Sequence, residues 1–267
     1  MIWHLIALSR WRAAAGARYL PAEQDPAGFV HASPDEPTVL AVANALYAQA
    51  GEPLVALALD EAALTAPVRH EPADPAPPPG VPAGTLFPHI YGLVDTAAVT
   101  AVRYLRPGAA GGYTGLEARP ATAERLDLLP HPEGGWYRET WAARPRFQPA
   151  GYPGARAPAT AVYFLLTPGT RSCWHAVRSD ELWLWHAGGP LALWLGGTGS
   201  EPATDPANLT LGPDLAAGQH PQQLVPGGHW QAAEPAGPHE VLVSCVVAPG
   251  FDFADFTVSD HEPGTAE

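Results

Sequence analysis

Short apolar runs dominate the second half of the chain, and glycine and proline separate them. These runs cover residues 160–166, 182–186, 191–195, 223–225, 240–247 and 251–258. Short β-prone segments between Gly/Pro turns are typical of antiparallel sandwiches and barrels. We therefore predict an all-β domain here, with one short helix near residues 121–129.

The first half of the chain mixes helical and strand-like patterns. Strands are predicted at residues 2–8, 28–32, 54–59, 89–91 and 99–105. Ser9 is placed to cap a helix that runs to residue 17, and a second helix is predicted over residues 37–49. A proline-rich loop at 72–84 separates the later strands. This mixture predicts a small α+β domain.

The two patterns meet in a segment without periodicity, RPGAAGGYTGLEAR at 106–119. Clusters of glycine and proline favour a linker. We therefore predict an N-terminal domain at 1–107, a linker at 108–119, a β-sandwich domain at 120–260 and a flexible tail at 261–267.

The charge balance narrows the possible partners and chemistry. The net charge is −13, and all 14 cationic side chains are arginines, so the 267 residues include no lysine. The absence of lysine excludes Schiff-base and P-loop lysine chemistry, and the acidity disfavours nucleic acid. The 11 histidines are then the main candidates for proton transfer and metal binding.

Two cysteines are too few for a disulfide scaffold. The first apolar run lacks the flanks of a signal peptide, and no stretch of the chain is apolar over about 18 residues. We therefore expect a cytoplasmic protein without a membrane partner.

The second half also carries side chains at a spacing that suits a ligand cradle. Cys173 and His175 are two residues apart, so in a strand they would project to the same face. Glu181 follows after a short turn, and a later Pro-Gly-Gly turn leads to Gln231. A thiolate in such a set would favour zinc or iron, whereas nitrogen and oxygen ligands alone would suit manganese, iron or nickel.

This pattern resembles the cupin superfamily, whose first motif pairs two histidines one residue apart with a later glutamate. More specifically, residues 126–260 resemble the cupin-related domain-of-unknown-function family 985 (DUF985). The segments that carry the resemblance are PHPEGGWYRET at 130–140, YFLL at 163–166, SDE at 179–181, VPG at 225–227, WQA at 230–232 and APGF at 248–251.

The resemblance implies a double-stranded β-helix, or jelly roll, and a homodimer that pairs through this domain. It also implies a divalent metal (Zn, Fe or Mn) held by Cys173, His175, Glu181 and Gln231. Glutamine at the last ligand position is normal in this family, whereas Cys173 stands where the superfamily has a histidine. The alternative is that Cys173 and His175 line the interior without a metal.

Further side chains are candidates for holding a substrate or moving its protons. Tyr137, Arg138, Trp183 and Trp185 form the candidate substrate-binding set, and Glu139 and His229 are the candidate catalytic residues. Aromatic walls and a guanidinium suit a sugar-like or nucleotide-like metabolite. The alternatives are an Arg138–Glu139 ion pair, a solvent-facing turn at His229, and tryptophans that only fill a hydrophobic core. Cys245 is expected to pack in a core strand.

Histidines mark the strand-like segments of the first half. The segments IWHL at 2–5, GFVHAS at 28–33, VRHE at 68–71 and FPHIYG at 87–92 resemble the domain-of-unknown-function family 952 (DUF952) over residues 1–107. That family is distantly similar to ADP-ribosyltransferase-type folds. The resemblance therefore implies a pocket for NAD or ADP-ribose formed by His4, His31, Arg69, Glu71, His89 and Tyr91. The alternative is that these histidines are hydrogen-bonded core or turn residues.

Both halves thus favour the binding of small molecules. In the leading hypothesis, the cupin-like half binds a polar metabolite, and a divalent metal supports isomerase or epimerase chemistry while Glu139 or His229 moves a proton. The alternative is a metabolite-binding protein without a metal or a catalytic step. The sequence leaves open whether the protein is an enzyme.

Overall fold

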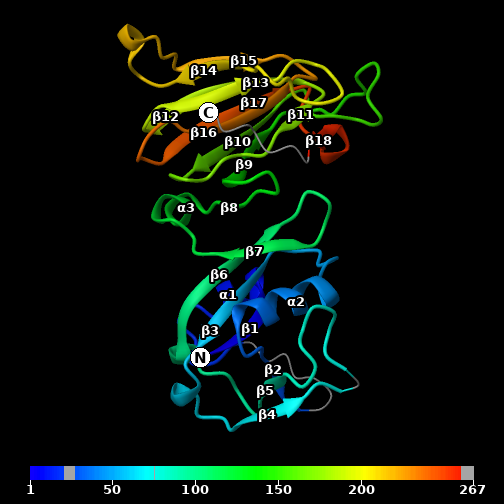
Figure 1. The fold of residues 1–267 in the computed structure, drawn as a ribbon, viewed down its shortest axis with the longest axis vertical. Helices are drawn as coiled ribbons and strands as arrows, with labels where there is room; N and C mark the ends of the chain where they lie inside the picture. The colour runs from blue at the N-terminus through cyan, green and yellow to red at the C-terminus, as the bar shows by residue number, and fades with distance from the viewer. Residues whose placement is uncertain (21–27, 75, 260–267) are drawn as a thin grey trace. The chain divides into compact units, whose positions relative to one another are not determined.

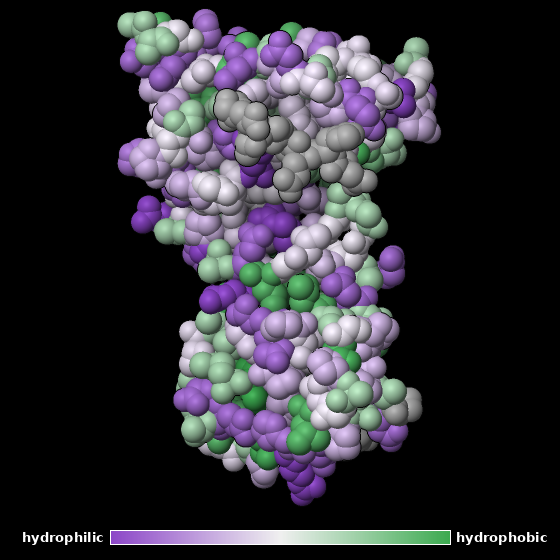
Figure 2. Space-filling model, viewed as in Figure 1, coloured by the Kyte–Doolittle hydropathy of each residue, from purple (hydrophilic) through white to green (hydrophobic). Residues whose placement is uncertain are grey.

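The computed structural model describes residues 1–20, 28–74 and 76–259, so the predicted tail at 261–267 lies outside the described residues. The chain forms two compact units, residues 1–119 and 120–267 (Figure 1). In the view of Figure 2, hydrophilic and intermediate residues cover most of the visible surface of each unit. No helix within the described ranges is long and apolar enough to cross a membrane.

The N-terminal unit is built on a four-stranded antiparallel sheet. In spatial order, its strands are β1 (Ile2–Ala7), β3 (Leu54–Leu59), β6 (Val99–Pro107) and β7 (Tyr113–Glu117). Every residue of β3 is buried, as expected for an uninterrupted apolar run. Trp3 and Leu105 join the core that this sheet forms.

Two helices accompany this sheet, α1 (Leu8–Ala13) and α2 (Glu36–Leu46). The carboxylate of Asp35 accepts a hydrogen bond of 2.8 Å from the backbone N–H of Thr38 and so caps α2. Val39 and Ala43 lie one turn apart on α2 and pack into the core of the sheet. Both helices are shorter than the pattern predicts.

A second, three-stranded sheet completes the N-terminal unit. Its order is β2 (Val30–His31), β5 (Leu86–Ile90) and β4 (Val68–Pro72). Two short 3-10 helices, η1 (Glu61–Ala63) and η2 (Thr96–Ala98), lie in the connections.

The segment 108–119 differs from the linker that its glycines suggest. Residues within it form β7, which pairs with β6. The side chain of Asn44 fixes this strand because it accepts a 2.7 Å hydrogen bond from the Tyr113 N–H and donates one of 2.9 Å to the Tyr113 carbonyl. Tyr113 and Leu116 also pack against the core of the sheet. The glycines therefore form the β6–β7 turn.

The C-terminal unit contains two antiparallel sheets. The six-stranded sheet has the order β15 (Gln222–Val225), β12 (Asp180–Gly188), β17 (Val241–Ala248), β10 (Thr160–Leu166), β9 (Trp136–Ala142) and β8 (Leu129–Pro130). The five-stranded sheet has the order β14 (Ala207–Leu211), β13 (Leu191–Leu195), β16 (Trp230–Pro235), β11 (His175–Val177) and β18 (Phe256–Val258). The helical segments are α3 (Ala121–Leu126), η3 (Leu215–Ala217) and η4 (Phe253–Asp255).

The two sheets of this unit pack face to face around one apolar core. Phe164 and Val243 from the first sheet share that core with Leu193 and Ala233 from the second. Alternate residues of β17 are fully buried, as the period of two in a strand requires. The all-β fold expected for the second half is confirmed. One predicted strand, 251–258, is instead divided between η4 and β18.

Candidate functional site

A cluster of buried polar side chains lies between the two sheets of the C-terminal unit. His175 and Gln231 are directly opposite each other on β11 and β16, so their side chains share a face. Glu181 comes from β12 in the other sheet, and its carboxylate accepts a hydrogen bond from Gln231 Nε2. All three residues are buried. The sandwich thus brings together three of the four residues that the sequence motif selects as metal ligands.

The amide of Gln231 has a fixed orientation. Its Oε1 accepts a 3.0 Å hydrogen bond from the indole Nε1 of Trp183, which can only donate. Its Nε2 must then face Glu181. If the amide were flipped, its Nε2 would face the indole N–H of Trp183, and its Oε1 would face the carboxylate oxygen of Glu181. Gln231 is therefore a structural bridge between Trp183 and Glu181.

Glu133 joins this cluster from the loop between β8 and β9. Its Oε2 lies 3.3 Å from His175 Nε2, and the two side chains are 9% and 3% exposed. The loop is held where it is by a 2.7 Å hydrogen bond from the Cys173 N–H to the Glu133 carbonyl. Gly134 follows with φ of +113°, and a Cβ there would lie 2.6 Å from the Arg171 carbonyl oxygen. Only glycine fits this close approach.

Burial sets the protonation of this pair. It raises the pKa of Glu133 to about 8, and it lowers the pKa of His175, against the attraction of Glu181. His175 Nδ1 donates a 2.9 Å hydrogen bond to the Cys173 carbonyl, so Nε2 is the nitrogen that carries a lone pair toward Glu133. At neutral pH the pair therefore consists of a carboxylic acid and a neutral imidazole.

Burial also raises the pKa values of the neighbouring acid and thiols. Burial raises the pKa of Glu181, and Glu133 adds to that effect, while His175 opposes it. Burial, followed by the charge of Glu133, raises the pKa of Cys173 to about 12. Cys245 packs in the core as expected, and burial raises the pKa of its thiol well above the usual range, with Glu181 beside it adding to the shift. Neither cysteine is a thiolate here.

Residues 121–259, just over half of the chain, match the family model described as the cupin superfamily (DUF985). The chain belongs to the cupin superfamily. Residues 5–102 match a second model, described as a protein of unknown function (DUF952). Both family resemblances expected from the sequence are confirmed.

Solved structures similar to this cupin protein come from bacteria and from a protozoan. A Shewanella oneidensis protein is 36% identical, with a TM-score of 0.46 over 52% of this chain and 82% of its own. A hypothetical protein from Leishmania major is 32% identical, with a TM-score of 0.47 over 51% of this chain and 84% of its own. A Caulobacter crescentus protein is 24% identical, with a TM-score of 0.33 over 42% of this chain and 92% of its own. No curated protein matches the chain.

The residues of the cupin unit do not fit the four-ligand metal set that the motif implies. The Gln231 oxygen is occupied by Trp183, and its Nε2 is the group that faces Glu181. Cys173 lies before β11, outside any strand, and its thiol keeps its proton. Among the described residues, no three His, Cys, Asp or Glu side chains are gathered as metal ligands. We derive no step through a metal.

The other residues proposed from the sequence fall into two groups. Tyr137 and Trp185 pack against the core of the sandwich, and the Trp185 indole donates a 3.0 Å hydrogen bond to the Gly189 carbonyl. Arg138 and Glu139 are both exposed and adjacent on β9, so they point to opposite faces. His229 lies in the turn before β16, where Nδ1 donates a 3.1 Å hydrogen bond to the Pro226 carbonyl.

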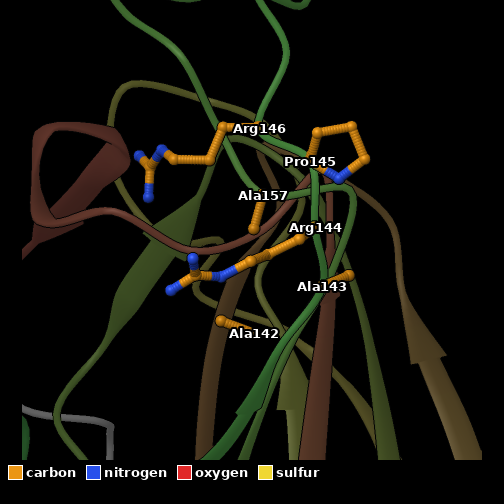
Figure 3. A pocket seen from close by; sticks show the side chains of 6 residues that line it. All are labelled: Ala142, Ala143, Arg144, Pro145, Arg146 and Ala157. Carbon is orange, nitrogen blue, oxygen red and sulfur yellow. The ribbon is translucent and has the colours of Figure 1, made fainter.

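A separate surface pocket lies at the end of β9. It has a volume of about 600 Å³ and is lined by residues 142–146 and Ala157. The side chains of Arg144 and Arg146 extend to the same side of this pocket in Figure 3. The pocket shares no lining residue with the cluster around His175. It therefore does not extend the candidate site.

The N-terminal candidates are mostly brought together. His31, Arg69, Glu71, His89 and Tyr91 all lie on the three-stranded sheet or directly after its middle strand. His4 is a buried residue of β1 in the other sheet, and its Nδ1 donates a 2.9 Å hydrogen bond to the His31 carbonyl.

Sequence reasoning missed Glu133 and Phe29. Glu133 stands 42 positions before His175, so only the closed sandwich makes them neighbours. The available signal was its place before Gly134-Gly135, since paired glycines often allow close approach of a loop. Phe29, which stacks on His89, lies in the GFVHAS segment, where the sequence pattern selects only His31.

Proposed function

We propose that the cupin unit binds a polar, sugar-like or nucleotide-like metabolite and that Glu133 and His175 move a proton on it. The observation that carries this proposal is the buried contact of 3.3 Å between Glu133 Oε2 and His175 Nε2. One member of the pair holds a proton at neutral pH, and the other accepts one. General acid–base catalysis requires such a pair.

Isomerase or epimerase chemistry is the reaction class that best suits the pair. In such a reaction, His175 Nε2 would take the proton from a carbon next to a carbonyl, while the acid of Glu133 would give its proton to the carbonyl oxygen. Reversal of the two transfers, with the proton returned to a different position or face, gives the isomer. The step conserves protons and needs no oxidant or reductant.

The buried surroundings support this chemistry. A water-poor interior strengthens the interaction of Glu133 with a developing oxyanion. The hydrogen bond from His175 Nδ1 to the Cys173 carbonyl keeps the reactive nitrogen directed at Glu133. Glu181, Gln231 and Trp183 hold one another in place and act as positioning residues.

A non-catalytic metabolite-binding protein is the second candidate function. It is favoured by the saturated network, since the amide of Gln231 is engaged at both its oxygen and its nitrogen. In this case Glu133 and His175 would serve only as a hydrogen-bond donor and acceptor for the ligand.

Proton exchange with solvent separates the two functions. The full-length protein is incubated in D₂O with a panel of ketoses, aldoses and their phosphates, and deuterium uptake at carbon is followed by NMR. We expect uptake with wild type and with the control Asp205→Asn, an exposed residue of the same unit, and loss with Glu133→Gln and His175→Asn. Binding without exchange would support the second function, and neither binding nor exchange would contradict both.

A further inference from the structure

One face of the three-stranded sheet in the N-terminal unit carries an unusual row of nitrogen-bearing side chains. His31 on β2 lies opposite His89 on β5, and His89 lies opposite Arg69 on β4. Directly opposed residues in a sheet share a face. Glu71 stands two residues beyond Arg69 and so belongs to the same face.

The opposite face of this sheet belongs to the core. Val30, Ile90 and Val68 form the neighbouring row, and Val30 and Ile90 are buried. Phe87 and His89 are buried on the other face as well, whereas His31 and Arg69 on that face are exposed and can meet a ligand.

Glu71 orients the imidazole of His89. His89 Nδ1 donates a 2.8 Å hydrogen bond to Glu71 Oε2, and the Tyr91 hydroxyl donates one of 2.9 Å to the same oxygen. These two hydrogen bonds lower the pKa of Glu71, so it remains a carboxylate that needs a proton on Nδ1. A neutral His89 carries its lone pair on Nε2, and this nitrogen has no hydrogen-bond partner within the described part of the chain.

Aromatic rings hold this imidazole in place. The ring of Phe29 stacks on His89 at 4.1 Å between centroids, and the ring of His31 meets His89 edge-on at 5.2 Å. A ring fixed on both sides keeps Nε2 in one position. Pre-organisation of this kind is typical of binding and catalytic histidines.

Arg69, opposite His89 on β4, supplies a positive charge on the same face of the sheet. Its guanidinium lies 4.5 Å from the centre of the Tyr91 ring and the residue is exposed, so its N–H donors remain accessible in the plane of the group. Glu71 would repel an anionic ligand bound by Arg69, but this repulsion is reduced because Oε2 of Glu71 already accepts two hydrogen bonds.

We propose that this face is a second ligand site, which takes a small hydroxylated oxyanion. Arg69 binds the phosphate or carboxylate of the ligand, and Nε2 of His89 accepts a hydrogen bond from its hydroxyl. A guanidinium pairs well with either oxyanion. The site goes beyond the proposed function, because it lies in the other unit and uses none of its residues.

Four probes test the two halves of this recognition on the full-length protein. Glycerol 3-phosphate and glycerate carry both groups, inorganic phosphate lacks the hydroxyl carbon chain, and glycerol lacks the oxyanion. Histidine ring resonances are followed by NMR during each titration. We expect shifts at His31 and His89 with one or both of the first two probes, weaker shifts with phosphate and none with glycerol.

Variants separate this site from general attraction of anions. Arg69→Gln is expected to weaken binding roughly tenfold or more, since it removes a charged hydrogen bond. Arg103→Gln, on the other sheet of the same unit, is the matched control and should bind as wild type does. His175→Asn should also leave this binding unchanged, which keeps the test independent of the proposed function.

Three results would overturn the proposal. The first is the absence of resonance shifts with every probe at millimolar concentration. The second is equal weakening by Arg69→Gln and Arg103→Gln, with both variants folded by thermal unfolding. The third is that inorganic phosphate binds as tightly as glycerol 3-phosphate and glycerate do. Neither the ligand hydroxyl nor His89 would then contribute to recognition.

Discussion

At the scale of the residue, Glu133 determines the chemistry of the cupin interior. A carboxyl in a dry environment releases its proton reluctantly, and burial raises the pKa of Glu133 to about 8. The neighbouring imidazole is neutral for the same reason. One physical cause, the loss of solvent, therefore produces both an acid and a base in contact.

The raised pKa of Glu133 also makes stability depend on pH. The unfolded chain loses this proton near the usual value of 4.5, whereas the folded protein keeps it until about pH 8. The native state then binds more protons than the unfolded state, so the contribution of Glu133 is complete below pH 4.5 and is lost as pH rises to about 8. Between these two pH values, Glu133 should lower the unfolding free energy of wild type by up to about 1.4 kcal/mol per pH unit. We expect Glu133→Gln to remove this pH dependence.

Urea unfolding between pH 5 and pH 9 measures this effect. The difference in unfolding free energy between Glu133→Gln and wild type should favour the variant increasingly up to about pH 8 and then level off. Glu139→Gln is the control, because Glu139 is exposed on β9. Parallel curves for Glu133→Gln and wild type would show that Glu133 titrates normally.

The indole of Trp183 provides a second test at the residue scale. Trp183→Phe removes the donor to Gln231 Oε1 and leaves a buried carbonyl oxygen without a partner. We expect a loss of about 1–3 kcal/mol for the unmade hydrogen bond, in addition to the loss of packing. A double-mutant cycle of Trp183→Phe and Gln231→Leu, followed by chemical unfolding, isolates the interaction between the two side chains, since Gln231→Leu alone also removes the hydrogen bond to Glu181. A coupling free energy of zero would contradict the bridging role of Gln231.

At the scale of the element, strands were more predictable than loops. The apolar runs located β10, β12, β13, β15 and β17, because alternation and burial are local properties of a strand, but they did not mark β8, β9, β11, β14 and β16. The position of Glu133 depends on a loop that crosses to β11, and nothing near it in the sequence encodes that crossing. The motif selected His175, Glu181 and Gln231, which the structure brings into one cluster, but it assigned a metal-ligand role to Gln231, whose two polar atoms are already engaged.

Gly134 tests whether this loop positions Glu133. Its φ is +113°, and an added Cβ would meet the Arg171 carbonyl at 2.6 Å, so Gly134→Ala must displace the loop. Gly151→Ala is the matched control, with φ of +80° and open space around the Cβ. We expect the control to lose about 1 kcal/mol from backbone strain alone. Gly134→Ala should lose more stability in thermal unfolding and should lose proton exchange. Equal effects of the two substitutions would contradict the positioning role.

At the scale of the whole molecule, the chain consists of two units with separate cores. Composition and periodicity distinguished an α+β first half from an all-β second half. The sequence pattern places the limit of the first unit too early, because the glycines of the β6–β7 turn resemble a linker. Asn44 and Tyr113, 69 residues apart, fix β7 through contacts that no local pattern reveals.

Truncation of the chain tests whether the first unit ends at residue 119 or at residue 107. A fragment of residues 1–119 keeps β7, whereas a fragment of residues 1–107 loses it and exposes the edge of β6. The shorter fragment also loses the packing of Tyr113 and Leu116. We expect 1–119 to unfold cooperatively by circular dichroism and 1–107 to be less stable or aggregated. Equal stability of the two fragments would restore the linker interpretation.

The central claim is that Glu133 and His175 form a buried neutral pair that holds one transferable proton. Its most direct test is ¹³C NMR of the Glu133 side-chain carboxyl in the full-length protein, assigned by its absence in Glu133→Gln. The account predicts a protonated carboxyl at pH 6.5 that titrates with a midpoint near pH 8. A carboxyl that is already ionised at pH 6.5 would contradict it.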